Sequence, residues 1–164
     1  MKKSKITGLL LAVVAGAGLF ASCGSDDSSS SPEITKVWAR TSPMETSLGA
    51  VYMSIASKDG DELTDVTVDP SIAAKAQIHE MVMAPSDTTL PMTSDVPTGE
   101  MVMQEVDSVV IDAGGSVDLK PGSYHIMLLE LVAPLELGAK FDVTLTFSKA
   151  GKITVTAEVR DEAP

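Results

Sequence analysis

Alternation of apolar and polar residues is the clearest pattern along this chain. It is strict at 141–147 (FDVTLTF) and 153–159 (ITVTAEV), and shorter runs rich in β-branched residues precede these segments. A period of two is typical of a strand that buries one of its faces. The pattern predicts strands at 34–40, 50–56, 63–68, 76–83, 101–106, 108–112, 116–119, 124–131, 141–147 and 153–159.

Turn residues separate the predicted strands. They include Lys-Asp-Gly at 58–60, Ala-Gly-Gly at 113–115 and Lys-Pro-Gly at 120–122. One segment, 71–76, favours a helical turn, and the proline-rich segment 84–100 favours a long loop between two strands. Many short strands at regular spacing indicate a single all-β domain, a Greek-key sandwich or a small barrel.

The N-terminal residues resemble a bacterial lipoprotein signal. Three lysines precede an apolar run at 8–20, which is too short for an ordinary membrane-spanning helix, and small residues then lead to Cys23. We therefore expect a signal peptide at 1–22, lipidation of Cys23, a flexible Ser/Asp tether over 23–32 and a folded domain at 33–160. Ordinary secretion with an incidental cysteine is the alternative. Both interpretations predict an exported protein. If Cys23 is lipidated, the protein is anchored at the cell envelope, in the periplasm or on the outer face of the membrane.

Composition and charge exclude several classes of function. The 164 residues include 23 acidic and 12 basic ones, so the formal net charge is −11 and no basic stripe is present to neutralise nucleic-acid phosphates. A single cysteine rules out an internal disulfide and a cysteine-based zinc finger. The local motifs of serine hydrolases, phosphate-binding loops and helical zinc proteases are missing from the sequence, so we do not expect an enzyme.

Methionine and histidine occur together in an unusual way. Both histidines of the chain have a methionine two positions later, in His79-x-Met81 and His125-x-Met127. Residues i and i+2 of a strand share a face about 6.5–7 Å apart, so each pair presents imidazole and thioether on one side. Further methionines stand nearby: Met83 lies in the same predicted strand as His79, and Met101 and Met103 lie in the next one.

These donors suit a soft metal ion. Thioether sulfur is neutral and prefers Cu(I), and imidazole also binds copper, whereas a blue-copper centre would need a cysteine thiolate. Methionine also fills gaps in hydrophobic cores, so packing is the competing interpretation of any single one. The pattern predicts a soft-metal site only if the strands that carry these residues adjoin.

The segment from 37 to 159 resembles the periplasmic copper chaperones of the PCuAC type. The similarity is carried by VWAR at 37–40, HEM at 79–81 and, above all, LKPGSYHIML at 119–128. It implies a cupredoxin-like Greek-key β-barrel or sandwich that holds one Cu(I) ion. The ligands that it implies are His79, Met103, His125 and Met127.

The spacing of the ligands departs from the family pattern at one point. Met103 lies 22 positions before His125, as the family pattern requires, but 24 positions after His79, a longer interval that places an insertion at 84–100. Other methionines therefore remain alternatives for the ligand, namely Met81, Met83, Met92 and Met101.

The resemblance also implies a function. Proteins of this type carry Cu(I) to extracytoplasmic copper proteins such as cytochrome c oxidase subunit II, so a role in cytochrome c oxidase assembly is expected, with the membrane reached through the lipid anchor. The alternatives are copper buffering or storage, or a lipid-anchored β-sandwich for cell-envelope adhesion or assembly that binds no metal.

Overall fold

The chain folds as an all-β domain, as the alternation predicts. The computed structural model describes residues 31–43, 47–83 and 101–164, and within these ranges no helix is long and apolar enough to cross a membrane. The strands are β1 (Glu33–Arg40), β2 (Leu48–Ser57), β3 (Asp61–Val68), β4 (Ala73–Met83), β5 (Met101–Glu105), β6 (Val109–Ile111), β7 (Gly115–Leu119), β8 (His125–Leu131), β9 (Lys140–Phe147) and β10 (Gly151–Arg160).

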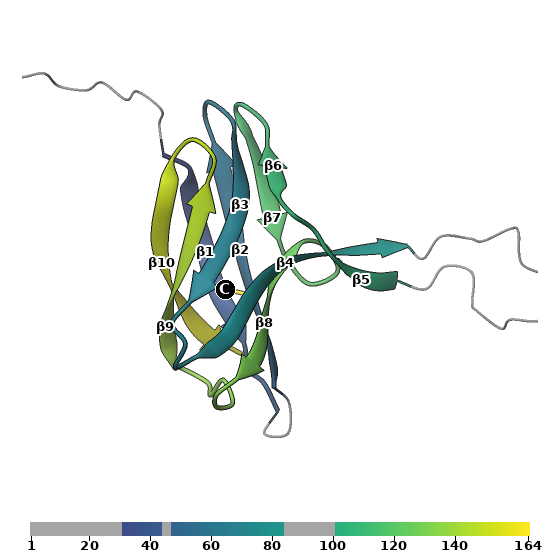
Figure 1. The fold of residues 1–164 in the computed structure, drawn as a ribbon, viewed down its shortest axis with the longest axis vertical. Helices are drawn as coiled ribbons and strands as arrows, with labels where there is room; N and C mark the ends of the chain where they lie inside the picture. Colours follow the sequence, from purple (N-terminus) through teal and green to yellow (C-terminus); the bar gives the residue numbers. More distant parts are fainter. Residues whose placement is uncertain (1–30, 44–46, 84–100) are drawn as a thin grey trace, which may run out of the picture.

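Strand order explains how distant parts of the sequence meet. Neighbours in the sheet follow the order β5-β4-β8-β2-β1-β10-β9-β3-β6, and β7 pairs with β2 beyond the end of β8. β1 and β10 pair in parallel, and the other ladders are antiparallel. The sheet curls into a sandwich in which β3 lies against β4 (Figure 1).

The core fills the space inside this curl. Every second residue of the central strands points inward, and Val51, Ile126 and Leu145 have no exposed surface at all. The residues between them therefore face outward. On β4 and β8 these outward positions include both histidines, so the same alternation that builds the core also sets the side on which the candidate ligands lie.

A β-bulge in β1 accounts for the loose alternation at 34–40. Ile34 pairs with Ile55 and Ala39 pairs with Val51, although the step from Ile34 to Ala39 is five positions and the step between their partners is only four. The bulge takes up one extra residue, with Lys36 at φ 51°, so that both apolar residues can face the core. Trp38 consequently lies opposite Tyr52.

The predicted helical turn at 71–76 is wrong beyond its first residues. The carboxylate of Asp69 accepts a hydrogen bond from the backbone N–H of Ser71 (2.8 Å), and the carbonyl oxygen of Asp69 accepts one from the backbone N–H of Ile72 (2.9 Å). These two bonds make a tight turn. β4 already begins at Ala73, which pairs with Leu131. Pairing with β8 thus overrides the helix propensity of the alanine-rich segment.

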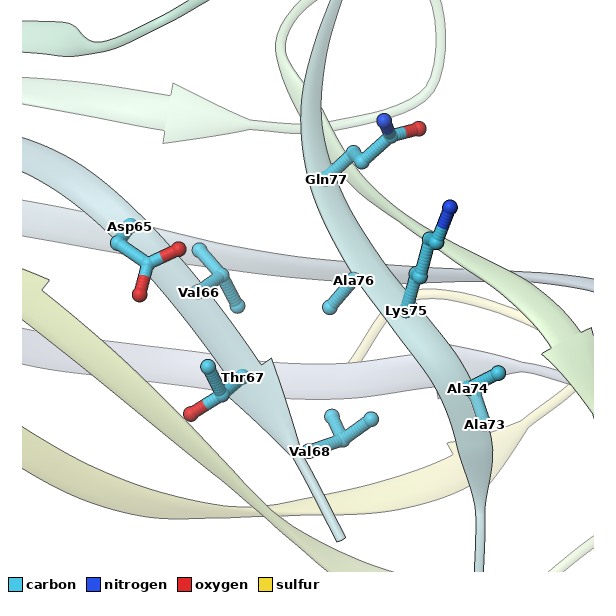
Figure 2. Close-up of a pocket in the computed structure, with 9 residues that line it drawn as sticks. All are labelled: Asp65, Val66, Thr67, Val68, Ala73, Ala74, Lys75, Ala76 and Gln77. Carbon is cyan, nitrogen blue, oxygen red and sulfur yellow. The ribbon is translucent and has the colours of Figure 1, made fainter. Parts of the chain in front are cut away.

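A groove of about 350 Å³ lies where β3 faces β4 (Figure 2). It is lined by 65–68 and 73–77, which include the small side chains of Ala73, Ala74 and Ala76. Neither histidine nor methionine lines it. The groove is therefore distinct from the place where the candidate ligands gather.

The outer half of β4 leaves the sandwich. From His79 to Met83 the strand pairs with β5, whereas its ladder with β8 ends at His79. β4 and β5 thus form a two-stranded ribbon that projects from the domain (Figure 1). The predicted signal peptide, Cys23, most of the tether and the predicted loop at 84–100 lie outside the described residues.

Candidate metal centre

The two histidines of the chain lie side by side. His79 of β4 and His125 of β8 are directly opposite each other in the antiparallel ladder, and their ring centroids are 5.8 Å apart. The adjacent isoleucines explain this arrangement, because Ile78, which precedes His79, and Ile126, which follows His125, are also a cross-strand pair and both are buried in the core. The histidine next to each isoleucine must then point to the outer face.

Hydrogen bonds fix the tautomers of both rings. The carbonyl oxygen of Ser123 lies 3.1 Å from His125 Nδ1, so Nδ1 carries the proton and Nε2 keeps its lone pair. The amide oxygen of Gln77 lies 3.3 Å from His79 Nε2, so on this ring Nδ1 has the lone pair. Each imidazole is thus oriented by one nitrogen and left with the other as a metal donor.

One of these donor atoms has no partner among the residues that the structure describes. His79 Nδ1 is buried and makes no hydrogen bond to any of them. Burial and the neighbouring His125 lower the pKa of His79, while the nearby Glu105 acts in the opposite direction. A neutral imidazole with a buried, unsatisfied lone pair is the state that a metal ion requires of its ligand.

Thioethers lie on both sides of the imidazole pair. Met127 is two residues beyond His125 on the same face, opposite Gln77, and only 9% of it is exposed. Met81 and Met103 form a cross-strand pair on the other side of the histidines, where Met103 is 54% exposed. The structure therefore brings all four ligands implied by the sequence to one face, with Met81 as a neighbour of Met103.

The other candidate metal ligands lie farther from the histidines or outside the described residues. Met83 and Met101 form the next cross-strand pair along the ribbon, one step farther from the histidines than Met81. Met92 and the lipidation candidate Cys23 lie outside the described residues.

Two neighbours of the histidines were not anticipated from the sequence. Glu105 of β5 lies opposite His79, and the ring of Tyr52 is 6.4 Å from that of His125.

Tyr52 also contacts Trp38, with ring centroids 4.7 Å apart. Burial raises the pKa of Tyr52, although Arg40 acts in the opposite direction. The period of two through Met101, Met103 and Glu105 could have indicated the carboxylate, whereas the aromatic contacts depend on strand pairing.

The donor set determines which metal this face could hold. Within 31–43, 47–83 and 101–164, no three side chains from histidine, cysteine, aspartate and glutamate come together as a metal-binding group. A hard or borderline ion such as Mg²⁺ or Zn²⁺ therefore lacks a complete site there. Two imidazoles completed by thioethers form instead a neutral nitrogen and sulfur set that suits a soft monovalent ion.

The fold is that of PCuAC domains. One solved structure that shares it is the apo PCuAC domain from PmoF1, which is 23% identical and aligns over 82% of this chain and 96% of that chain with a TM-score of 0.60. The copper-bound PCuAC domain from PmoF2 is 20% identical and aligns over 82% of this chain and 95% of that chain with a TM-score of 0.58. The solution structure of CuI-DR1885 from Deinococcus radiodurans is 20% identical and aligns over 85% of this chain and 86% of that chain with a TM-score of 0.54. These likenesses establish the predicted β architecture.

Sequence comparison identifies the family. Residues 33–159 match the family described as "Putative lipoprotein LpqE-like". A curated relative, "Putative lipoprotein Lxx21020" from Leifsonia xyli subsp. xyli (strain CTCB07), is 31% identical over 130 residues, which span 79% of this chain and 69% of the relative. The chain therefore belongs to the LpqE-like family.

Proposed function

We propose that this protein is an extracytoplasmic Cu(I) chaperone. The observation that carries the proposal is the cross-strand imidazole pair, with ring centroids 5.8 Å apart and thioethers on either side. His79, His125, Met127 and Met103 would hold the ion, with Met81 the rival of Met103. Similarity to the copper-bound PCuAC domain from PmoF2 supports the choice of metal.

The arrangement suits a carrier better than an enzyme. The four donors are neutral, so they stabilise a monovalent ion without the additional charge that a thiolate would bring. His125 and Met127 are buried and preorganised, whereas Met103 is exposed and flexible, so a recipient's ligand can displace it first. Loading and release can therefore proceed by exchange of one ligand at a time.

The finer parts of the proposal concern location and recipient. The family and its curated relative are described as lipoproteins, which supports an exported protein anchored through Cys23. A recipient must offer a soft-ligand copper site outside the cytoplasm. The copper centre of cytochrome c oxidase subunit II is the recipient that the PCuAC resemblance implies, and copper buffering is the alternative if no recipient accepts the ion.

Anaerobic titration against a competing Cu(I) chelator tests the proposal. We expect stoichiometric binding by the full chain, and we expect both His125→Ala and Met127→Ala to weaken it at least tenfold, which corresponds to about 1.4 kcal/mol. Val82→Ala is the matched control. Val82 lies between Met81 and Met83 in β4, so its side chain is on the opposite face of the strand from the candidate ligands. Unchanged binding in both ligand variants would refute the imidazole site, whereas no binding by the unaltered chain would leave a metal-free envelope sandwich as the better interpretation.

A further inference from the structure

A double row of methionines continues outward from the imidazole pair. In the β4–β5 ribbon Met81 pairs with Met103, and Met83 pairs with Met101. His79 belongs to the same ladder, opposite Glu105. Because directly opposed residues and residues two apart share a face, all four thioethers stand on the side of the ribbon that holds His79.

These side chains contribute little to the core. Met83 is 70% exposed and Met101 is 44% exposed, in contrast to Met53, which is 2% exposed and packs in the core. In the part of the chain that the structure describes, no other strand lies beside the ribbon at these rows, since β8 ends its pairing with β4 at His79. Packing against the described core therefore does not account for the exposed thioethers of Met83, Met101 and Met103.

The outer pair is too far away to complete the imidazole site. Rows on one face of a strand are about 6.5–7 Å apart, so Met83 lies about 13–14 Å along β4 from His79. Cross-strand neighbours, by contrast, have Cβ atoms only about 4.5–5.5 Å apart. The sulfurs of Met83 and Met101 can thus meet at one ion, together with one sulfur of the Met81–Met103 row.

We propose that the ribbon carries a second, thioether-only Cu(I) site, formed by Met83 and Met101 with one of Met81 and Met103. This inference rests on the proposed function, in which the other methionine of the middle row belongs to the imidazole site. The ligand class is a soft monovalent cation, Cu(I) or Ag(I), because neutral sulfur donors bind hard divalent ions poorly.

The middle row would connect the two sites. An ion at the outer site already touches Met81 or Met103, and it can move inward by exchanging a thioether for the free Nδ1 of His79. Copper remains Cu(I) throughout, and no electron or proton is transferred in this step, because neutral ligands replace neutral ligands. The exposed ribbon would thus receive the ion and the buried pair would retain it.

Stoichiometry and copper K-edge absorption spectra of the full chain test this inference. We expect two equivalents of Cu(I) for the unaltered chain and one for Met83→Leu/Met101→Leu, which keeps side-chain size and apolar character. The control is Val82→Leu/Val102→Leu on the reverse face of the same ribbon, which should still bind two. A single equivalent in the unaltered chain, or two in the methionine variant, overturns the second site.

A second variant separates this outcome from failure of the proposed function. In His79→Ala/His125→Ala we expect one equivalent with a sulfur-only absorption spectrum, since the outer site needs no imidazole. One equivalent in the unaltered chain and none in this variant would retain the imidazole site and refute the outer one. No binding in any form, including the unaltered chain, would refute both, and circular dichroism shows that each variant is folded.

Discussion

At the scale of single residues, polar groups on the outer face depend on defined partners. Gln77 orients His79, and the Ser123 carbonyl orients His125. Elsewhere a buried carboxylate, Asp61, accepts hydrogen bonds from the backbone of Glu62 (2.8 Å), Lys149 (2.9 Å) and Ala150 (3.0 Å). Hydrogen bonds of single residues thus hold both the candidate site and the start of β3 in place.

Replacing Gln77 should loosen the imidazole site without removing a ligand. In Gln77→Leu the His79 ring loses the acceptor that fixes its tautomer, and partners of this kind are worth about 10–100-fold in metal affinity. We expect Cu(I) affinity to fall within that range while stoichiometry is retained. Chelator competition measures the change, and an affinity equal to that of the unaltered chain would show that Gln77 does not position the ring.

Asp61 should make stability depend on pH. Burial would raise the pKa of Asp61, but three backbone donors and Lys149 outweigh it, so the pKa is lowered. A carboxylate with a lowered pKa stabilises the folded state at neutral pH, and this contribution is lost as the pH falls through the acidic range. Asp61→Asn should therefore lower the free energy of unfolding by about 1–3 kcal/mol at pH 7.

Urea unfolding at several pH values measures this effect. The difference between Asp61→Asn and the unaltered chain should shrink below about pH 4, where the carboxyl group of the unfolded chain is protonated. A difference that stays constant from pH 7 to pH 3 would contradict the assignment.

At the scale of elements, two irregularities shape the sandwich. The bulge in β1 allows Ile34 and Ala39 to face the same core, and its cost falls on Lys36, which has a left-handed backbone conformation with φ 51°. β4 changes partners at His79, where the ladder with β8 ends and that with β5 begins. The candidate ligands therefore lie where a sandwich strand becomes a ribbon strand.

Lys36→Gly should stabilise the domain. A left-handed conformation costs an L-residue about 1–2 kcal/mol, and glycine avoids this cost, although its greater freedom in the unfolded chain offsets part of the gain. We expect the free energy of unfolding to rise by up to about 1 kcal/mol. Thr35→Gly in the adjacent paired position is the control and should destabilise, and a loss of stability in Lys36→Gly would refute the strain.

The elements also show what could be predicted from the sequence. Alternation identified the strands and predicted that His125 and Met127 share a face, because a local period determines both. It could not predict that His79 meets His125, since they are 46 positions apart in the sequence and the ladder register between β4 and β8 decides the contact. The bulge and the first residues of β4 were likewise beyond a local pattern, as tertiary pairing determines them.

At the scale of the whole molecule, the first and last strands pair with each other in the middle of the sheet. β1 and β10 pair in parallel at the centre of the strand order, so both ends of the described domain are needed to complete the sheet. The candidate metal site, in contrast, joins β4, β5 and β8 at one end of that order. Ligands that bind only the folded state should stabilise all of these strands together.

Copper should therefore raise the stability of the entire domain. At a free Cu(I) concentration 100 times the dissociation constant, one bound ion adds about 2.7 kcal/mol to the free energy of unfolding. We expect this increase in anaerobic urea unfolding followed by circular dichroism, and a smaller increase in His125→Ala, whose imidazole site is weakened. An increase of equal size in that variant would mean that the ion binds elsewhere.

The row of rings from His79 through His125 and Tyr52 to Trp38 has a practical consequence. Successive centroids are 5.8, 6.4 and 4.7 Å apart, and Trp38 is the only tryptophan of the chain. A tilt of the imidazoles on loading would alter the packing of this row of rings, so the emission of the indole could serve as an intrinsic optical reporter. Cargo exchange with a tryptophan-free acceptor could be timed in solution without attaching a dye to either molecule.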